Sequence, residues 1–547
     1  MEWLIIGVVG LLVIAGATAL GPRLRISAPL ILVIMGIGVS FLPFIPDIEI
    51  SPEWILAGVL PPLLYSASVS MPSMNFRREF GAISGLSVVL VVASSVLLGL
   101  LFAWVIPGLG LGWGIALGAI VSPTDAVATS IVKRTGISPR VIAILEGESL
   151  LNDATALVLL RTAIASVGAA ISFWGVVGNF AFSVVVAIVI GYVVGRLNLI
   201  VRAHVSDATV NTVISFTVPF IASIPAELLG ASGLVAAVVA GIITGRRAPR
   251  VLSPEHRASD AQNWRMIELV LEGLVFLLMG LELAAIVADV QEEHDGLLPA
   301  LGVALIALVG TIVVRTGYVT PLLMSLRRRA KRIERMKPRM QQVQDRLDNS
   351  DSPGEAIAAL APTRGPAGKL VQRRRRSIDV ERFGARVRRG IADVDYFLEA
   401  PLGWREGAVV VWAGMRGAVT VAAAQTLPHG TPHRSLLVLI AFAVAALSLL
   451  IQGGTLNAFI RLVKPASPDP QTAHDEHARL LELLDGVTLD SNEGSPKQLA
   501  LALIAAKRAM LLDARDDGTF NAAVLESALD ALDAQQVSVQ LQGEQAP

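Results

Sequence analysis

Long apolar runs separated by short polar connections fill most of the first 464 residues of this sequence. A helix needs about 20 apolar residues to cross the hydrocarbon core of a bilayer. Measured against that length, the pattern predicts thirteen membrane-spanning helices. The predicted spans are residues 2–20, 27–44, 53–70, 81–105, 111–133, 139–167, 172–198, 208–224, 231–245, 262–288, 297–325, 402–427 and 432–461.

Basic residues occupy every second connection, and the connections after spans two, four, six, eight and ten contain no Lys or Arg. Because basic residues collect on the cytoplasmic side of a membrane, the N-terminus is predicted outside and the C-terminus inside. A miscounted helix would break this alternation, and Arg434, near the last outer connection, is its one exception. The residues that follow the rule include Arg23, Arg25, Arg77, Arg78, Lys133, Arg134, Arg140, Arg196, Arg202, Arg246, Arg247, Arg250 and Arg257.

An odd number of spans allows helices one to six to pair with helices eight to thirteen as an inverted repeat, with helix seven as the linker. In such folds, interrupted helices recur at matching positions of the two halves. Pro123 interrupts the fifth span, and Gly414 and Gly417 flank Arg416 in the twelfth. The sequence therefore predicts two broken helices, although small residues in the twelfth span are also compatible with close helix packing.

The composition supports a polytopic membrane protein, because 53% of the residues are hydrophobic and only 16% are charged. Soluble proteins contain about 25% charged residues. The chain has no cysteine, which excludes disulfides, thiolate metal sites and cysteine nucleophiles. No histidine pair has the context of a zinc site, which argues against a metalloenzyme. Neither an enzymatic activity nor a cofactor is predicted. The first apolar run lacks a basic start and carries Glu2, as expected of a membrane helix rather than a cleaved signal peptide.

Two segments lie outside the predicted membrane helices, which occupy residues 1–325 and 401–464. Residues 326–400 form a basic insertion, with two helical pieces joined by a Pro/Gly-rich link. Such a segment attracts anionic lipid at the cytoplasmic face, or it is a solvated linker that only follows the charge rule; nucleic acid is not favoured. Residues 465–547 have apolar residues at helical spacing and predict a small cytoplasmic helical module for packing or regulation.

Four carboxylates interrupt the apolar pattern between Ser122 and Asp153, namely Asp125, Glu146, Glu148 and Asp153 itself. Ionisable groups within membrane spans are expensive and mark ion paths by default. A broken helix beside a helix that carries carboxylates is how transporters build ion sites at mid-membrane. Glu146 is expected nearest the cytoplasmic mouth, because the sixth helix enters from that side.

The sixth span presents two polar faces. At 100° per residue, Glu148 and Asn152 share one face, Ser149 and Asp153 share the other, and the two carboxylates lie about 140° apart. The oxygens of Ser149 and Asp153, with those freed at the break, resemble a cage for a small monovalent cation, since a divalent ion usually gathers more carboxylates. The residues of the break that would contribute are Thr124 and Asp125.

Competition at Asp153 would explain an exchange reaction. Removal of a carboxylate from water favours its protonated form, so a proton and a cation compete for one group. If the site reorients only when one of them is bound, a downhill proton flux drives the cation the other way. The alternative is a structural carboxylate that pairs with a buried cation such as Arg161, two turns along the helix.

Glu148 requires a partner of opposite charge, and Arg315 and Arg416 are the buried basic candidates. Loss of one partner of a buried pair costs about 3–5 kcal/mol. Glu227 and Glu282 lie near the ends of spans, where exposure to water is expected. Glu272 lies deeper, and the sequence assigns it no role.

The motifs SPTDAVA and GESLLND, together with AELLGASGLVAAVVAGIITG, GLVFLLMGLEL and GMRGAV, resemble the NhaP-type monovalent cation/proton antiporters. Eukaryotic plasma-membrane sodium/proton exchangers belong to the same family. The resemblance covers about residues 1–464 apart from the insertion, which is not part of the common pattern. It implies a homodimer of thirteen-helix protomers, each with a dimerisation part and a six-helix core in which discontinuous helices five and twelve cross at the ion site.

The resemblance also implies roles for individual residues. Asp153 would be the carboxylate that binds ion and proton, and Asn152 takes the place of a second aspartate found in the electrogenic branch. A single carboxylate implies electroneutral, one-for-one exchange. Glu148 would pair with Arg315 to hold the core. The residues that would line the site with Asp153 are Thr124, Asp125 and Ser149.

The sequence therefore predicts an antiporter of the cytoplasmic membrane that exchanges Na⁺ (or Li⁺) for H⁺ and serves pH homeostasis. A K⁺/H⁺ antiporter is the alternative, because one sequence does not fix the size of the cage. A membrane sensor on the same scaffold and a passive channel are alternatives from other classes. The alternating connections, the broken helix and the carboxylates favour a transporter, and the tail carries no enzymatic or DNA-binding pattern.

Overall fold

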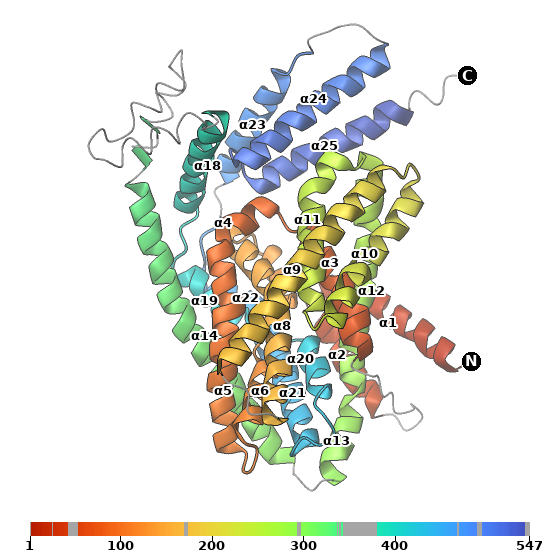
Figure 1. Ribbon diagram of the computed structural model, residues 1–547, viewed down its shortest axis with the longest axis vertical. Helices are drawn as coiled ribbons and strands as arrows, with labels where there is room; N and C mark the ends of the chain where they lie inside the picture. Colours follow the sequence, from red (N-terminus) through yellow and green to blue (C-terminus); the bar gives the residue numbers. More distant parts are fainter. Residues whose placement is uncertain are drawn as a thin grey trace. The chain divides into compact units, whose positions relative to one another are not determined.

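The structure of the protein is a computed structural model in which every regular element of the described residues is helical (Figure 1). This agrees with the predicted all-α class. The centre of the basic insertion, Arg25 and the predicted turn at residues 491–494 lie outside the described residues. The structure describes residues 2–24, 26–41, 53–168, 173–292, 297–335, 337–338, 341–342, 380–467, 470–489 and 495–541.

The chain divides into two compact units. The first contains Met1–Pro321 and Trp404–Ser467, and the second contains Leu322–Gly403 and Pro468–Pro547. The first unit holds the apolar helices, and the second holds the described parts of the insertion and the tail. The finer division into four parts, drawn from the sequence, stays a prediction.

Helices lie at the predicted spans of the first unit. The number of helices does not equal the number of membrane crossings, because one crossing can contain two helices separated by a break. Among the described residues, seven helices are long and apolar enough to cross a membrane, and four shorter apolar helices accompany them. The count of thirteen crossings and the inverted repeat stay predictions. The elements are α1 (Glu2–Leu24), α2 (Ala28–Ser40), η1 (Trp54–Val59), α3 (Leu60–Ser70), α4 (Ser73–Ser84), η2 (Gly85–Leu90), α5 (Val91–Val105), α6 (Leu111–Val121), α7 (Val127–Lys133), α8 (Pro139–Gly168), α9 (Phe173–Ala203), α10 (Ala208–Leu228), α11 (Gly233–Val251), α12 (Pro254–Leu281), α13 (Leu283–Glu292), α14 (Leu297–Glu334), α19 (Trp404–Trp412), α20 (Ala418–Gln425), α21 (Arg434–Ser448), η3 (Leu449–Gly453) and α22 (Gly454–Val463).

Both predicted interruptions are present. Residues 122–126 separate α6 from α7, because Pro123 has no N–H to continue the helical ladder. Residues 413–417 separate α19 from α20. We call these two segments the paired breaks.

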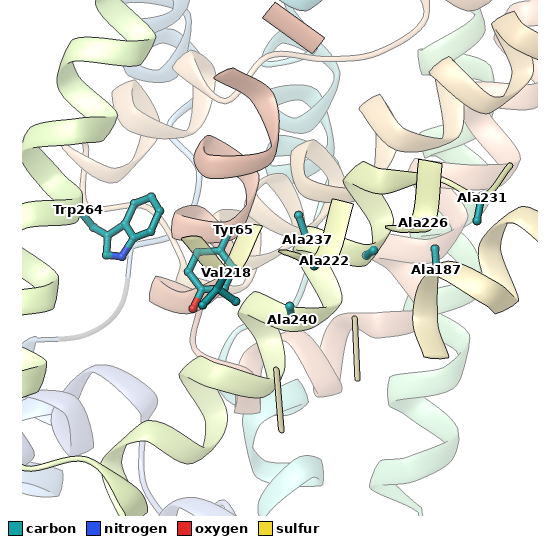
Figure 2. Close-up of a cluster of buried hydrophobic side chains, with 10 residues drawn as sticks. Tyr65, Ala187, Val218, Ala222, Ala226, Ala231, Ala237, Ala240 and Trp264 are labelled. Carbon is teal, nitrogen blue, oxygen red and sulfur yellow. The ribbon is translucent and has the colours of Figure 1, made fainter. Parts of the chain in front are cut away.

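Small residues allow the helices of the first unit to approach closely. A Cβ added to Gly241 of α11 would lie 2.6 Å from the backbone oxygen of Tyr65 in α3. Tyr65 and Trp264 pack with ring centroids 5.4 Å apart beside a group of buried alanines (Figure 2). Lipid tails are as apolar as leucine, so membrane helices associate through this kind of close packing rather than through hydrophobic burial.

Two ion pairs, each with a buried arginine, join helices that the sequence did not connect. Arg140 of α8 lies 2.6 Å from Glu79 of α4, and Arg202 of α9 lies 2.6 Å from Asp260 of α12. Arg202 is 0% exposed. The sequence placed both arginines in cytoplasmic connections, but burial away from water requires a partner of opposite charge for each.

The second unit contains the predicted tail helices, which are α23 (Pro470–Asp485), α24 (Pro496–Asp517) and α25 (Ala522–Leu541). Their shared core includes Leu480, Leu511 and Leu525. Helix α18 (Val380–Glu399), from the insertion, lies against this module, and Arg389 is 3.4 Å from Asp517. Lys337, from the other end of the insertion, pairs with Asp395 of α18. The insertion and the tail therefore share one folded unit.

The close approach of α3 and α11 predicts that Gly241→Val lowers the thermal unfolding midpoint of the purified protein. The added side chain would overlap backbone atoms of α3, and such overpacking costs about 1–3 kcal/mol. The matched control is Gly178→Val in α9, where an added Cβ meets no atom within 4 Å. Equal midpoints for the two variants, measured by heating in detergent before size-exclusion chromatography, would show that the contact does not limit stability.

Candidate functional site

The paired breaks satisfy each other's backbone groups. In a continuous helix, the N–H of Asp125 would donate to the carbonyl of Val121. Here it donates instead to the carbonyl of Met415, at 2.8 Å. The carbonyl of Val121 accepts from Nε of Arg416, at 2.9 Å. Each break therefore supplies the partner that the other break lacks.

The carboxylate of Asp125 holds the beginnings of two helices. It accepts a hydrogen bond from the N–H of Val127, at 2.8 Å, where α7 begins. It also accepts from the N–H of Ala418, where α20 begins. A negative charge is favourable at a helix N-terminus. Gly417 is required beside it, because an added Cβ would overlap the Asp125 carboxylate.

Arg416 hydrogen-bonds to backbone groups at both breaks. Its guanidinium donates to the carbonyls of Val121 and Gly414, and its N–H donates to Oγ of Ser448 at 2.8 Å. The side chain is 2% exposed. A buried cation thus meets the end of α6, where the helix dipole favours positive charge.

Glu148 pairs with Arg315 rather than with Arg416. Two parallel hydrogen bonds of 2.5 and 2.8 Å join the guanidinium of Arg315 to the carboxylate of Glu148. Nε of Arg315 also donates to the carbonyl of Val410, at 3.0 Å, near the end of α19. Both charges are buried, and this bidentate geometry is the strong form of an ion pair. The pair joins α8, α14 and α19.

Thr124 lies on the Glu148 face of α8. Its hydroxyl donates to Glu148 at 3.1 Å and accepts from Nδ2 of Asn152 at 2.8 Å. Nδ2 also donates to the Thr124 carbonyl, at 3.1 Å. An aspartate at position 152 could not donate these bonds, so the neutral amide holds the break against α8. The structure thus gives the Thr124 hydroxyl a structural partner in addition to its predicted ligand role.

Asp153 lies on the opposite polar face with Ser149, and each is 8% exposed. No hydrogen bond or ion pair joins the Asp153 carboxylate to any residue that the structure describes. Asp125 lies within electrostatic range of it. Glu272 of α12 is in turn within range of Asp125. The described residues contain no group of three acidic or histidine side chains close enough to hold one metal ion.

The structure separates the remaining predicted residues from this group. Glu146 pairs with Lys133. Arg161, considered as a partner for Asp153, instead lies 3.1 Å from Glu227, and both side chains are largely exposed. The expected exposure of Glu282 is wrong, because its side chain is only 6% exposed. The reason is tertiary: Gln425 of α20 hydrogen-bonds it at the junction of α12 and α13.

Three polar residues of this region were not singled out from the sequence. Ser448 bonds to both backbone groups of Arg416, and Ser87 of η2 donates to the carbonyl of Glu148 at 3.1 Å. Gln452 of η3 is fully buried. Polar residues inside apolar spans are the signal that points to such positions, since each must find a partner away from water.

The buried pair predicts that reversal of one charge, Glu148→Arg or Arg315→Glu, sharply lowers the yield of folded protein. A lone buried charge costs about 3–5 kcal/mol. The double reversal should recover part of the yield, as measured by size-exclusion profiles at matched expression. The control is the same reversal of the exposed Arg161–Glu227 pair, which should have little effect. A double variant as poorly folded as the single ones would contradict the pairing.

Comparisons with known proteins agree with this architecture. Residues 9–337, more than half of the chain, match the family model described as sodium/hydrogen exchanger, transmembrane. An uncharacterized Na⁺/H⁺ exchanger of Mycobacterium tuberculosis is 27% identical over 84% of this chain and 75% of its own length. The YjcE exchanger of Escherichia coli is 37% identical over 48% of this chain and 49% of its own length.

A solved structure shares the fold. The sodium/proton antiporter MjNhaP1 of Methanocaldococcus jannaschii aligns with a TM-score of 0.59 and 15% identity, over 84% of this chain and 98% of that one. The sodium, potassium, lithium and rubidium/H⁺ antiporter of Bacillus subtilis is 30% identical over 49% of this chain and 41% of its own length. This chain is thus a multi-pass membrane protein that belongs to the sodium/hydrogen exchanger family of cation/proton antiporters, of the NhaP type.

Proposed function

We propose that the protein exchanges Na⁺ or Li⁺ for H⁺ at Asp153, one ion for one proton. The observation that carries the proposal is the buried Asp153 carboxylate beside the paired breaks, without a protein partner among the described residues. A buried carboxylate needs a proton or a cation to offset its desolvation. Either one neutralises it, so the two compete. We call Asp153, Ser149, Asp125 and Thr124 the exchange site.

The neighbouring charges support a stoichiometry of one to one. Glu148 is neutralised by Arg315, and Asn152 is a neutral amide that holds the break. Asp125 is tied to two backbone N–H groups. Asp153 therefore remains as the group that changes its charge when ions exchange. One proton lost for one cation bound leaves the net charge of the occupied site constant, which makes the exchange electroneutral.

K⁺ is the alternative to Na⁺ or Li⁺ as the exchanged cation. The oxygen ligands proposed here, a carboxylate and a hydroxyl, suit hard monovalent cations but do not set the size of the cage. The B. subtilis relative carries sodium, potassium, lithium and rubidium in its name, and this favours K⁺ as the second candidate. A sensor or a channel is less compatible with the antiporter family.

We also propose the surroundings in which this exchange takes place. The alternation of basic connections supports a cytoplasmic-membrane protein with its N-terminus outside and its C-terminus inside. The resemblance of the sequence motifs to NhaP-type antiporters implies a homodimer. The basic residues of the insertion support contact with anionic lipid. Exchange of Na⁺ for H⁺ would serve pH homeostasis, and no cofactor takes part.

The proposed role of Asp153 predicts that Asp153→Asn abolishes exchange. Addition of Na⁺, Li⁺ or K⁺ to inside-out vesicles with an imposed pH gradient should collapse that gradient in the wild type, as followed with a pH-sensitive dye. Asp153→Asn should respond at background level, because an amide can neither release a proton nor neutralise a cation. Glu227→Gln, at an exposed position, is the control and should behave as the wild type. Exchange that persists in Asp153→Asn would place the site elsewhere.

One-for-one exchange predicts a rate that is nearly independent of membrane potential. A membrane potential imposed with valinomycin in proteoliposomes, with Na⁺ as the tested cation, should change the rate of wild-type exchange less than about twofold. Each net charge moved across the membrane is worth about 2.3 kcal/mol per 100 mV. A rate that rises steeply with potential would mean that a second group, such as Asp125 or Glu272, releases a proton as well.

A further inference from the structure

A second buried acceptor group lies at the other end of α20. Glu282 is 6% exposed and hydrogen-bonds the side chain of Gln425. Oε1 of Glu282 and Oε1 of Gln425 are both buried, and neither has a hydrogen-bond partner in the part of the chain that the structure describes. A buried carboxylate oxygen left without a donor is costly, and either a proton or a bound cation would offset that cost.

Helix α20 connects this pair to the exchange site. Ala418, its first residue, donates its N–H to Asp125, and Gln425, its last residue, contacts Glu282. Positions 418 and 425 are seven residues apart and lie on one face of the helix, about 10 Å from each other. Ala422, on the same face between them, is small and buried.

Arg434, at the end of α20, does not neutralise Glu282. Arg434 donates to the backbone carbonyls of Leu427 and Gln425, at 2.9 and 3.0 Å. No ion pair joins Arg434 to Glu282 among the described residues. Arg434 therefore bonds to backbone carbonyls at the end of α20. The Oε1 atoms of Glu282 and Gln425 remain free to bind a cation.

We propose that Glu282 and Gln425 form a second binding position for the transported monovalent cation, on the outer side of the exchange site. A carboxylate and an amide oxygen are the hard ligands that such a cation prefers. The proposal rests on the antiport function and on the predicted topology, in which α20 runs outward from the paired breaks. A cation entering from outside would meet this pair before it reaches Asp125 and Asp153.

The test compares the two faces of the membrane. Half-saturating Na⁺ is measured for wild type and Glu282→Gln in right-side-out and inside-out vesicles. Loss of one charged ligand should raise the half-saturating concentration at the outer face about tenfold, and change it less than about twofold at the inner face. Gln425→Leu, which keeps the carboxylate, should shift the outer value in the same direction. Glu227→Gln is the control for removal of an exposed glutamate.

Three results would overturn the proposal: an unchanged outer value in both variants, an equal change at both faces, or an altered pH dependence of exchange without a change in half-saturation. The last would make Glu282 a proton carrier. If Glu282→Gln does not fold, Gln425→Leu decides the question by the same measurement. Normal wild-type exchange with unaltered variants removes only this inference, whereas a wild type that exchanges no cation removes the proposed function as well.

Discussion

The structure depends on the satisfaction of backbone hydrogen bonds where two membrane helices are interrupted. A bilayer offers no water to the freed N–H and C=O groups, so the protein must supply every partner itself. The N–H of Asp125 donates to the carbonyl of Met415 across the breaks, and Arg416 donates to the carbonyl of Val121, which Asp125 would have used in a continuous helix. Arg315 takes the carbonyl of Val410 in the same way. Each break therefore depends on the other for partners of its freed backbone groups.

This constraint also sorts the charges. Arg315 and Arg416 both donate to backbone carbonyls and both are buried. Arg315 is neutralised by Glu148, and Arg416 is surrounded by carbonyl oxygens. Thr124 and Asn152 fasten the first break to α8. After these bonds are made, Asp153 is the carboxylate of α8 that has no protein partner among the described residues. Asp153 is free to bind ions because the neighbouring polar side chains already have partners within the protein.

Much of this arrangement was predictable from the pattern of the sequence. Pro123 fixed the first break because proline cannot continue the ladder, and Gly414 and Gly417 indicated the second. Helical spacing separated the Glu148 face from the Asp153 face, and the structure keeps them apart. The predicted exposure of Glu282 failed for a physical reason. Its position near the end of a span does not reveal that α20, more than 130 residues later in the chain, covers it.

By itself, the sequence determined the all-helical class, the places of the two breaks and the residue types available for exchange. These depend on local properties: apolar run length, proline, glycine and helical periodicity. The tertiary structure alone decided partners. In the structure, Arg315 pairs with Glu148, and Arg161 pairs with Glu227 at an exposed position. Glu282 is buried and contacts Gln425. Partnership depends on which helices meet, and residues far apart in the chain meet only through the packing of the whole unit.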